Sequence, residues 1–292
     1  VTNTLTAVKN AQMAQSPVLL FGGAAATVLK GRGSLQDIDQ LSMLKPITKW
    51  ATTIKTVSAL KPTVEKAIEI AKGGVPGPVF IEVPVDLLYQ EELVKDWYLS
   101  ESGVKNAKNM GAKALGLYLK AHLYRQFHQP HFELDLPTPE LRLPGRAESK
   151  ISEVVSLLKK AERPALVIGS QTLVNLEDAE PLRAAVEQLG IPCWLGGMGR
   201  GLLGRKSPIQ LRHKRTKALK EADLVIVCGF PFDFRLAYGR AIGSKATLVA
   251  ANLSARDLKK NRRPQVALQM HPGRFLQKLA AGFGSGEGKW DG

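Results

Sequence analysis

Three short glycine-containing segments in the second half of the chain have residue types that suit phosphate binding. They are Gly169-Ser170-Gln171, Gly196-Gly197-Met198 and the single residue Gly229. Each segment directly follows an apolar run of the kind that forms a buried strand. At such a strand end, glycine lets backbone N–H groups approach a diphosphate, and the helix that follows adds its positive end. The pattern predicts an anion site, although tight turns alone would explain the same glycines.

Charged residues accompany these glycines. Arg215 and Arg235 would each add charge-assisted contacts to a bound anion, and Asp233 lies beside Arg235 in the same segment. A solvent-exposed helix charge is the alternative interpretation of Arg215. The run GGMGRG, which begins at Gly196, lacks the spacing G-x-G-x-x-G and does not indicate a standard NAD site. We therefore expect residues 149–281 to bind a nucleotide of another kind.

The overall charge also indicates an anionic partner, but not a nucleic acid. Lys and Arg number 41 against 26 Asp and Glu, which gives a formal net charge of +15. The basic residues are dispersed along the chain. We find no zinc-finger spacing, no aromatic RNA-binding motif and no basic helix followed by heptads. No nucleic-acid partner is therefore predicted.

The cysteines and the N-terminal residues bear on the cellular environment. Cys193 and Cys228 lie in apolar runs, so they indicate neither a disulfide framework nor a zinc site, and we expect a reducing compartment. The first residue is valine, and no charged segment followed by an apolar core marks a signal peptide. The longest uncharged stretch, residues 10–29, is interrupted by polar residues, proline and glycine, so we expect no transmembrane segment.

The first part of the chain alternates helical patterns with continuous apolar runs. We expect helices over residues 3–15 and 63–72 and strands over residues 18–21 and 79–83. Both strands are apolar throughout rather than alternating, which is typical of a parallel sheet covered by helices on both faces. Residues 1–95 are therefore predicted to form an α/β domain.

A polar and later proline-rich stretch, residues 96–148, is expected to connect two domains. It contains one predicted helix, residues 112–127. The apolar face of this helix and the cations around it are formed by Leu115, Tyr118, Leu119, His122, Leu123, Lys113, Lys120 and Arg125. A basic amphipathic helix can lie in a membrane interface, which would make a peripheral membrane contact. Packing against its own domains is the alternative.

The second domain is expected over residues 149–281. Its predicted strands are residues 165–168, 191–195, 224–228 and 247–251, and its predicted helices are residues 151–161, 182–189, 214–221 and 275–281. This alternation is typical of a Rossmann-like α/β domain with a parallel sheet. Residues 282–292 are rich in glycine and poor in apolar residues, and we expect a flexible tail there.

Taken together, several motifs resemble the thiamine-diphosphate-dependent enzymes. Their pyrimidine-binding domain has segments similar to VTNTLTAVKNAQMAQSPVLLFGG, GSLQDIDQLSMLKPITKW and GGVPGPVFIEVPVDLLY. Their central domain has segments similar to RPALVIGSQ, LGIPCWLGGMGRGLLG and ADLVIVCGFPFDFRL. The pair GGMGRGLLG and DFRLAYGR looks closest to the animal acetolactate-synthase-like and 2-hydroxyacyl-CoA lyase branch. The resemblance implies a partial pyrimidine-binding domain followed by a Rossmann-like central domain.

The resemblance also implies a reaction and its cofactors. These are thiamine diphosphate and Mg²⁺, with cleavage or formation of a C–C bond next to a carbonyl. The substrate would be an acyl-CoA or a 2-oxo or 2-hydroxy acid. Cleavage of a 2-hydroxyacyl-CoA to an aldehyde and formyl-CoA is the first expectation, and acetolactate-type condensation is another. The family's activating glutamate and metal-binding Gly-Asp-Gly element with its later Asn have no match in these residues. We therefore expect no turnover from this stretch alone.

Two residues of the first domain match active-site positions of the family. Asn3 and Gln36 correspond to positions that face the thiamine ring or the substrate. The alternatives are a helix N-cap for Asn3 and a surface helix position for Gln36. Asp86, in the motif PVD, is interpreted as a cap of the segment that follows it.

In the central domain, relatives use the strand-end glycines to hold FAD or ADP, and the ADP part of CoA is a further candidate. The sequence departs from the family at three positions. Pro231 stands where some relatives have arginine, Asn252 where many have an aspartate for the ribose, and His271 where many have aspartate. These departures remove an expected cation and the usual ribose acceptor.

Two rival interpretations stay open beside the enzyme. One is a non-catalytic module that binds ADP, CoA or FAD, and the other is an inactive partial gene product. For the parent enzyme, the resemblance implies a homo-oligomer located at the endoplasmic reticulum membrane, with an anchor that is not among these 292 residues.

Overall fold

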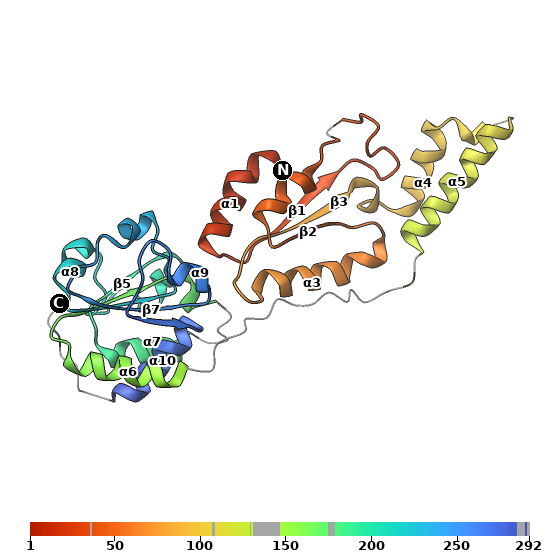
Figure 1. The fold of residues 1–292 in the computed structure, drawn as a ribbon. Helices are drawn as coiled ribbons and strands as arrows, with labels where there is room; N and C mark the ends of the chain where they lie inside the picture. Colours follow the sequence, from red (N-terminus) through yellow and green to blue (C-terminus); the bar gives the residue numbers. More distant parts are fainter. Residues whose placement is uncertain are drawn as a thin grey trace. The chain divides into compact units, whose positions relative to one another are not determined.

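The computed structural model describes most of the chain, namely residues 1–35, 37–106, 109–128, 130, 147–174, 179–284 and 290. The chain divides into two compact units, Val1–Pro139 and Glu140–Gly292. Each unit contains a parallel β-sheet with helices packed on it (Figure 1). The fold is therefore α/β, as the continuous apolar runs of the sequence predict.

A three-stranded parallel sheet forms the centre of the first unit. Its strands are β1 (Leu19–Ala24), β2 (Trp50–Thr53) and β3 (Val79–Pro84), in the order β1-β3-β2. β3 is buried along its whole length because it lies between the other two strands and is covered on both faces. This position explains its nearly uninterrupted apolar sequence.

Helices cover both faces of this sheet. α3 (Leu60–Lys72) packs on one face, while α1 (Leu5–Ala14) and α2 (Gln40–Leu44) contribute to a cluster around Phe80 on the other. The two helices predicted in this region are confirmed as α1 and α3. Short 3-10 turns are Thr2–Thr4, Lys45–Ile47, Val57–Ala59, Val85–Leu87 and Val104–Asn106.

Two further helices, α4 (Glu91–Glu101) and α5 (Met110–Phe127), also belong to the first unit and pack against each other (Figure 1). The residues that join them are Val94, Tyr98, Leu119 and Leu123. The helix predicted over residues 112–127 is thus confirmed, but it is part of a compact unit rather than of a connection. Within the described residues, no helix is long and apolar enough to cross a membrane.

Asp86 ties this helix pair to the sheet. Its buried Oδ2 accepts hydrogen bonds from the Thr27 N–H at 3.1 Å and the Thr27 hydroxyl at 2.5 Å. The Tyr98 hydroxyl donates to it at 2.6 Å and the Gln126 amide at 2.7 Å. Burial raises the pKa of the Tyr98 hydroxyl, which keeps it a donor. The predicted cap role of Asp86 is wrong, because α4, the helix that follows, has no side-chain cap and Asp86 bonds to Thr27, Tyr98 and Gln126 instead.

The second unit contains a five-stranded parallel sheet in the order β5-β4-β6-β7-β8. The strands are β4 (Pro164–Ile168), β5 (Cys193–Leu195), β6 (Leu224–Cys228), β7 (Thr247–Asn252) and β8 (Val266–Gln269). The first four are the predicted strands. β8 was not predicted, because it is short and alternates buried with partly exposed side chains.

Helices lie on both faces of this second sheet. α6 (Ala147–Lys160), α7 (Glu180–Leu189) and α10 (Pro272–Phe283) cover one face. α8 (Arg215–Glu221) and α9 (Ala255–Leu258) contribute to the cluster on the other. All except α9 correspond to predicted helices. Short 3-10 turns are Ser170–Thr172, Gly197–Gly201 and Phe234–Gly239.

The cysteines lie in the core of this unit. Cys193 and Cys228 are both free thiols and both buried, as predicted. Burial raises the pKa of Cys193 to about 12 and raises the pKa of Cys228 as well. Both thiols therefore act as small apolar core groups rather than as nucleophiles.

One residue of the expected flexible tail contacts the second unit. The Trp290 indole N–H donates to the carbonyl of Ala161 at 3.1 Å, and its ring stacks on Phe283 with the ring centroids 5.9 Å apart. α10 itself continues to Phe283, slightly beyond the end predicted for the domain.

Candidate functional site

The carboxyl edge of the second sheet brings the three glycine-containing segments together. Gly196 follows β5, Gly169 follows β4 and Gly229 follows β6, and these strands are neighbours in the order β5-β4-β6. The chain passes from β4 to β5 on one side and later to β6 on the other. A topological switch point, where open α/β sheets bind ligands, therefore lies at the end of β4.

The N–H groups of these three glycines are already used inside the sheet. Each donates to a backbone carbonyl of the neighbouring strand at 2.8 Å. A Cβ on Gly169 would lie 2.2 Å from the carbonyl oxygen of Gly229, and a Cβ on Gly196 would lie 2.5 Å from the Phe230 ring. Glycine is required at positions 169 and 196, because any Cβ there would clash with the loop after β6. These three N–H groups are therefore not free for a diphosphate, and nucleotide binding by the segments that contain them stays a prediction.

The neighbouring site residues mostly connect the same loops. Ser170 Oγ accepts a hydrogen bond from the Met198 N–H at 3.2 Å, and a Cβ on Gly197 would lie 2.0 Å from that oxygen. Gln171 is buried, and its Oε1 accepts a hydrogen bond from the Leu253 N–H at 2.9 Å. The Met198 side chain, in contrast, is exposed.

Asp233 and Arg235 form an ion pair with each other. Arg235 Nη2 lies 2.6 Å from Asp233 Oδ2, and Arg235 Nε donates to both carboxylate oxygens at 3.1 Å. The guanidinium also lies over the Phe230 ring, 5.2 Å from its centroid. The buried Asp233 carboxylate neutralises the charge of Arg235. Arg235 therefore stabilises the loop after β6 rather than acting as an isolated cation.

Arg215 lies at the wall of a cationic cavity of about 660 Å³ beside β5 and α8. It donates a hydrogen bond of 2.5 Å to the carbonyl of Arg235. The cavity is also lined by Trp194, Arg200, Gln210, Arg212 and Lys214. The described residues that line it include four cationic side chains and no carboxylate. Such a concentration of positive charge in a hollow suits a multivalent anion.

Three of these cations were not predicted. Arg200, Arg212 and Lys214 come from the segment between β5 and α8, and only the path of that segment brings them to one cavity. The basic run Arg212-His213-Lys214-Arg215 was the available signal. The Trp194 indole holds this run beside β5, because its N–H donates to the carbonyl of His213 at 3.1 Å.

Three buried side-chain polar atoms in this unit have no hydrogen-bond partner among the described residues, and Ser207 Oγ is one of them. The two others are Gln210 Oε1, from a residue that lines the cationic cavity, and Asn252 Nδ2, at the carboxyl end of β7. The other amide atom of Asn252 is satisfied, since its Oδ1 accepts a hydrogen bond from the Ser254 N–H at 2.8 Å. An unsatisfied buried group costs about 1–3 kcal/mol, so these atoms favour a ligand or water as partner.

His271 is the N-cap of α10. Its Nδ1 accepts hydrogen bonds from the N–H groups of Gly273 at 3.1 Å and Arg274 at 3.3 Å. Its Nε2 lies 2.6 Å from the carbonyl of Val174 and therefore carries the proton. Burial lowers the pKa of His271. Aspartate can cap a helix in the same way. Where many relatives have aspartate and this chain has His271, one helix-capping residue therefore stands in place of another.

A second cavity, of about 570 Å³, lies in the first unit at the carboxyl ends of β1 and β3. Most of the residues that line it are apolar, and the lining includes Val1, Thr2, Gly23, Gln40 and Val85. Asn3 is exposed and next in sequence to this lining, without forming part of it, and it caps no helix through its side chain. Gln36 lies outside the described residues.

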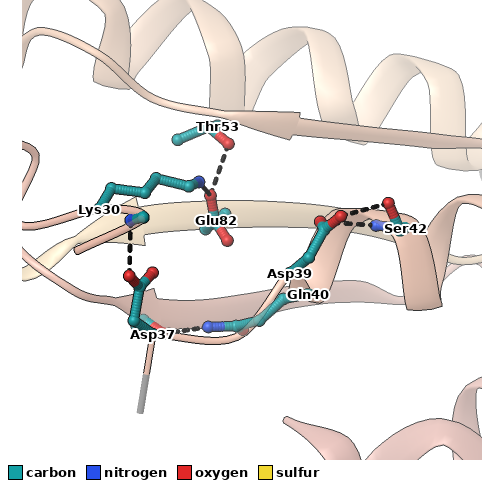
Figure 2. Close-up of polar contacts among 9 residues, drawn as sticks. Lys30, Asp37, Asp39, Gln40, Ser42, Thr53 and Glu82 are labelled. Carbon is teal, nitrogen blue, oxygen red and sulfur yellow. Dashed lines mark hydrogen bonds and ion pairs between the residues drawn. The ribbon is translucent and has the colours of Figure 1, made fainter. Parts of the chain in front are cut away.

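A buried carboxylate lies close to the strands that end at this cavity. Figure 2 shows Lys30 extending toward Glu82 of β3, with Thr53 of β2 on the same carboxylate. Lys30 Nζ lies 2.5 Å from Glu82 Oε2, and Thr53 Oγ1 lies 2.6 Å from it. Glu82 is only 1% exposed, and its Oε1 has no hydrogen-bond partner among the described residues. The ion pair fixes the segment around Lys30 to the sheet.

Gln40 contributes a polar group to this first-unit cavity. Its Nε2 donates to the carbonyl of Gly23 at 2.7 Å, while its buried Oε1 has no partner among the described residues (Figure 2). The preceding residue, Asp39, caps α2 by accepting from the Ser42 N–H at 3.1 Å. The Gln40 amide is therefore fixed beside the cavity, and its unsatisfied oxygen is buried rather than exposed to it. Lys30, Glu82 and Gln40 were not predicted as site residues.

The comparisons with known proteins define the class. Residues 151–279 match the family model described as thiamine pyrophosphate enzyme, central domain. The fold is similar to that of the Rhodococcus jostii RHA1 thiamine diphosphate-dependent 4-hydroxybenzoylformate decarboxylase, with a TM-score of 0.58 and 20% identity, over 96% of this chain and 48% of that one. The second unit therefore contains a thiamine pyrophosphate enzyme central domain.

Within this class, the chain is similar to proteins named 2-hydroxyacyl-CoA lyase 2. It is 45% identical to that of Danio rerio over 284 residues and 46% identical to that of Caenorhabditis elegans over 292, with 96% and 97% of this chain covered. A probable acetolactate synthase of Mycobacterium bovis is 28% identical over 252 residues, which covers 86% of this chain and 39% of that protein. The chain spans only 45% and 44% of the two lyases, about half their length.

Proposed function

We propose that this chain is part of a thiamine-diphosphate-dependent enzyme that cleaves 2-hydroxyacyl-CoA, and that its second unit holds the diphosphate of an adenine nucleotide. The observation that carries the second part is the cationic cavity lined by Arg200, Arg212, Lys214 and Arg215. ADP, CoA and FAD share an adenosine diphosphate. The relatives named as 2-hydroxyacyl-CoA lyases support the acyl-CoA substrate.

The chemistry of the cavity supports a phosphate ligand. Arginine guanidinium groups bind phosphate oxygens in pairs, and hydrogen bonds between charged groups are roughly twice as strong as neutral ones. Arg200, Arg212 and Lys214 are exposed and can move onto a ligand, whereas Arg215 is held by the carbonyl of Arg235. The volume of about 660 Å³ lies within the roughly 300–1,000 Å³ of small-molecule sites.

The geometry favours ADP or CoA over FAD as the occupant. The strand-end glycines, which would hold a flavin diphosphate, donate their N–H groups inside the sheet. Pro231 supplies no cation beside them.

The first unit would contribute the cavity at the ends of β1 and β3. Its mostly apolar lining residues suit an aromatic ring, such as the pyrimidine of thiamine diphosphate. When bound, that cofactor supplies a carbanion nucleophile for C–C cleavage. The described part of the chain has no group of three or more His, Cys, Asp or Glu for a metal. The Mg²⁺, the homo-oligomer and the endoplasmic reticulum location belong to this proposal through the family resemblance alone.

The test uses the natural protein that carries these residues, with thiamine diphosphate, Mg²⁺ and 2-hydroxyacyl-CoA esters of several chain lengths. Mass spectrometry should detect formyl-CoA and an aldehyde shorter by one carbon. Condensation of pyruvate without this cleavage would instead support the acetolactate synthase activity. Nucleotide binding with neither reaction would support the non-catalytic module.

A further inference from the structure

Helix α5 has a clearly defined inner face. Its buried residues are Gly116, Leu119, Leu123 and Gln126. Gln126 Nε2 donates to Asp86 Oδ2 at 2.7 Å and to Thr27 Oγ1 at 2.8 Å. His122 Nε2 also lies 2.7 Å from Thr27 Oγ1. These contacts fix the rotation of α5 about its axis, and they determine which side chains point outward.

The outward face carries large apolar side chains seven residues apart. Met110 is 86% exposed, Leu117 is 72% exposed and Tyr124 is 64% exposed. At 3.6 residues per turn, positions seven apart lie on the same side of a helix. The apolar face expected from the sequence packs within its own unit, because Leu119 and Leu123 are buried against α4, and this confirms the alternative interpretation of that face. The exposed stripe is on the opposite side.

Cations flank this stripe, and α5 has no carboxylates. Lys113 and Lys120, which are also seven residues apart, lie along one side of the stripe by helical geometry, and Arg125 lies on the other. All three are exposed, and the helix from Met110 to Phe127 contains no Asp or Glu. α4, which packs against it, carries four carboxylates, Glu91, Glu92, Asp96 and Glu101. Of these two helices, therefore, only α5 combines exposed apolar side chains with cations and lacks carboxylates.

We propose that the outward face of α5 lies in the interface of an anionic lipid bilayer. Met110, Leu117 and Tyr124 would enter the boundary between headgroups and acyl chains, and Lys113 and Lys120 would extend to the lipid phosphates. Tyrosine suits this depth because its ring is apolar and its hydroxyl is polar. The flanking cations favour an anionic surface over a neutral one. The helix would lie along the membrane rather than cross it.

This inference does not rest on the nucleotide site, which belongs to the other unit. The test is sedimentation of the 292-residue chain with phosphatidylcholine vesicles that contain or lack about a third of phosphatidylserine. We expect binding to the anionic vesicles that weakens in high salt. Leu117→Glu should lower the partition coefficient about tenfold or more. The double variant Lys113→Ala, Lys120→Ala should lower it by a similar factor.

The matched control is Ile68→Glu, which places the same charge on an exposed apolar position of α3 in the same unit. It should bind vesicles like the wild type, and unchanged circular dichroism should show that the α5 variants are folded. Equal loss of binding in Ile68→Glu would overturn the proposal. So would no vesicle binding by the wild type, or a dimer in sedimentation velocity that Leu117→Glu dissociates while vesicles are not bound.

Discussion

The Arg215 guanidinium donates a hydrogen bond of 2.5 Å to the backbone carbonyl of Arg235. This bond joins the start of α8 to the loop after β6, and the ion pair of Arg235 with Asp233, at 2.6 Å, holds that loop in turn. One wall of the cationic cavity is therefore placed by contacts within the protein. The remaining cations of its lining stay exposed and free to adjust to a ligand.

Gly169→Ala should destabilise the second unit by roughly 1–3 kcal/mol or more, because the new Cβ would lie 2.2 Å from a backbone carbonyl oxygen that cannot easily shift. The matched control is Gly201→Ala, where a Cβ would meet nothing within 4 Å, and a change within about 0.5 kcal/mol is expected. Urea unfolding followed by tryptophan fluorescence measures both. Unchanged stability of Gly169→Ala would contradict the packing role of this glycine.

The stability of the second unit should fall as the pH falls below about 6.5. Burial lowers the pKa of His271 in the folded chain, so the unfolded chain binds the proton first. The contribution of the neutral imidazole is present above the unfolded pKa and is lost as the pH falls through the folded pKa. Protonation also removes the Nδ1 acceptor that caps α10.

Thermal unfolding of His271→Asp and His271→Ala between pH 7.5 and 5 separates the two contributions. Aspartate keeps a cap and removes the imidazole, so the dependence on pH should become shallower. Alanine should cost about 0.5–2 kcal/mol at pH 7.5 through loss of the cap. A pH dependence in His271→Asp equal to that of the wild type would show that another group is responsible.

Lys30→Met should destabilise the first unit by about 2–3 kcal/mol, because it leaves the Glu82 carboxylate buried without a cation. Glu82→Gln should cost less, since Lys30 is partly exposed and can turn to water. The double variant should cost less than the sum of the two. Guanidinium unfolding followed by tryptophan fluorescence measures this double-mutant cycle, and the first unit contributes Trp50 and Trp97 to the signal. Equal costs for both single variants would contradict the buried position of the carboxylate.

Much of the fold was predictable because buried strands have a simple signature. β3, β4 and β6 are covered on both faces, so their residues are apolar with few exceptions, and each was predicted from that run. β8 was not predicted because it alternates buried with partly exposed side chains and lacks a continuous apolar run, and α9 was not predicted because its four residues are too few for a helical period. α4 was missed since its exposed face is acidic and the whole stretch has the composition of a connection.

The site was less predictable because it depends on contacts between distant segments. The sequence located the strand-end glycines correctly, but whether their N–H groups are free depends on the neighbouring strand. Arg215 was predicted, whereas Arg212 and Lys214 become significant only when the segment before α8 folds around one cavity. Lys30 and Glu82 are 52 residues apart, so no local pattern could show that they form an ion pair.

The measurement that most directly tests the nucleotide site is titration calorimetry of ADP into the 292-residue chain. We expect saturable binding at one site, and much weaker binding of adenosine, which lacks the diphosphate. Arg212→Ala and Lys214→Ala should each weaken binding roughly tenfold or more. Lys217→Ala, on the same helix as Arg215 but outside the described lining of the cavity, should have no effect. No heat with millimolar ADP, CoA or FAD, or equal weakening by Lys217→Ala, would contradict a nucleotide site in this cavity.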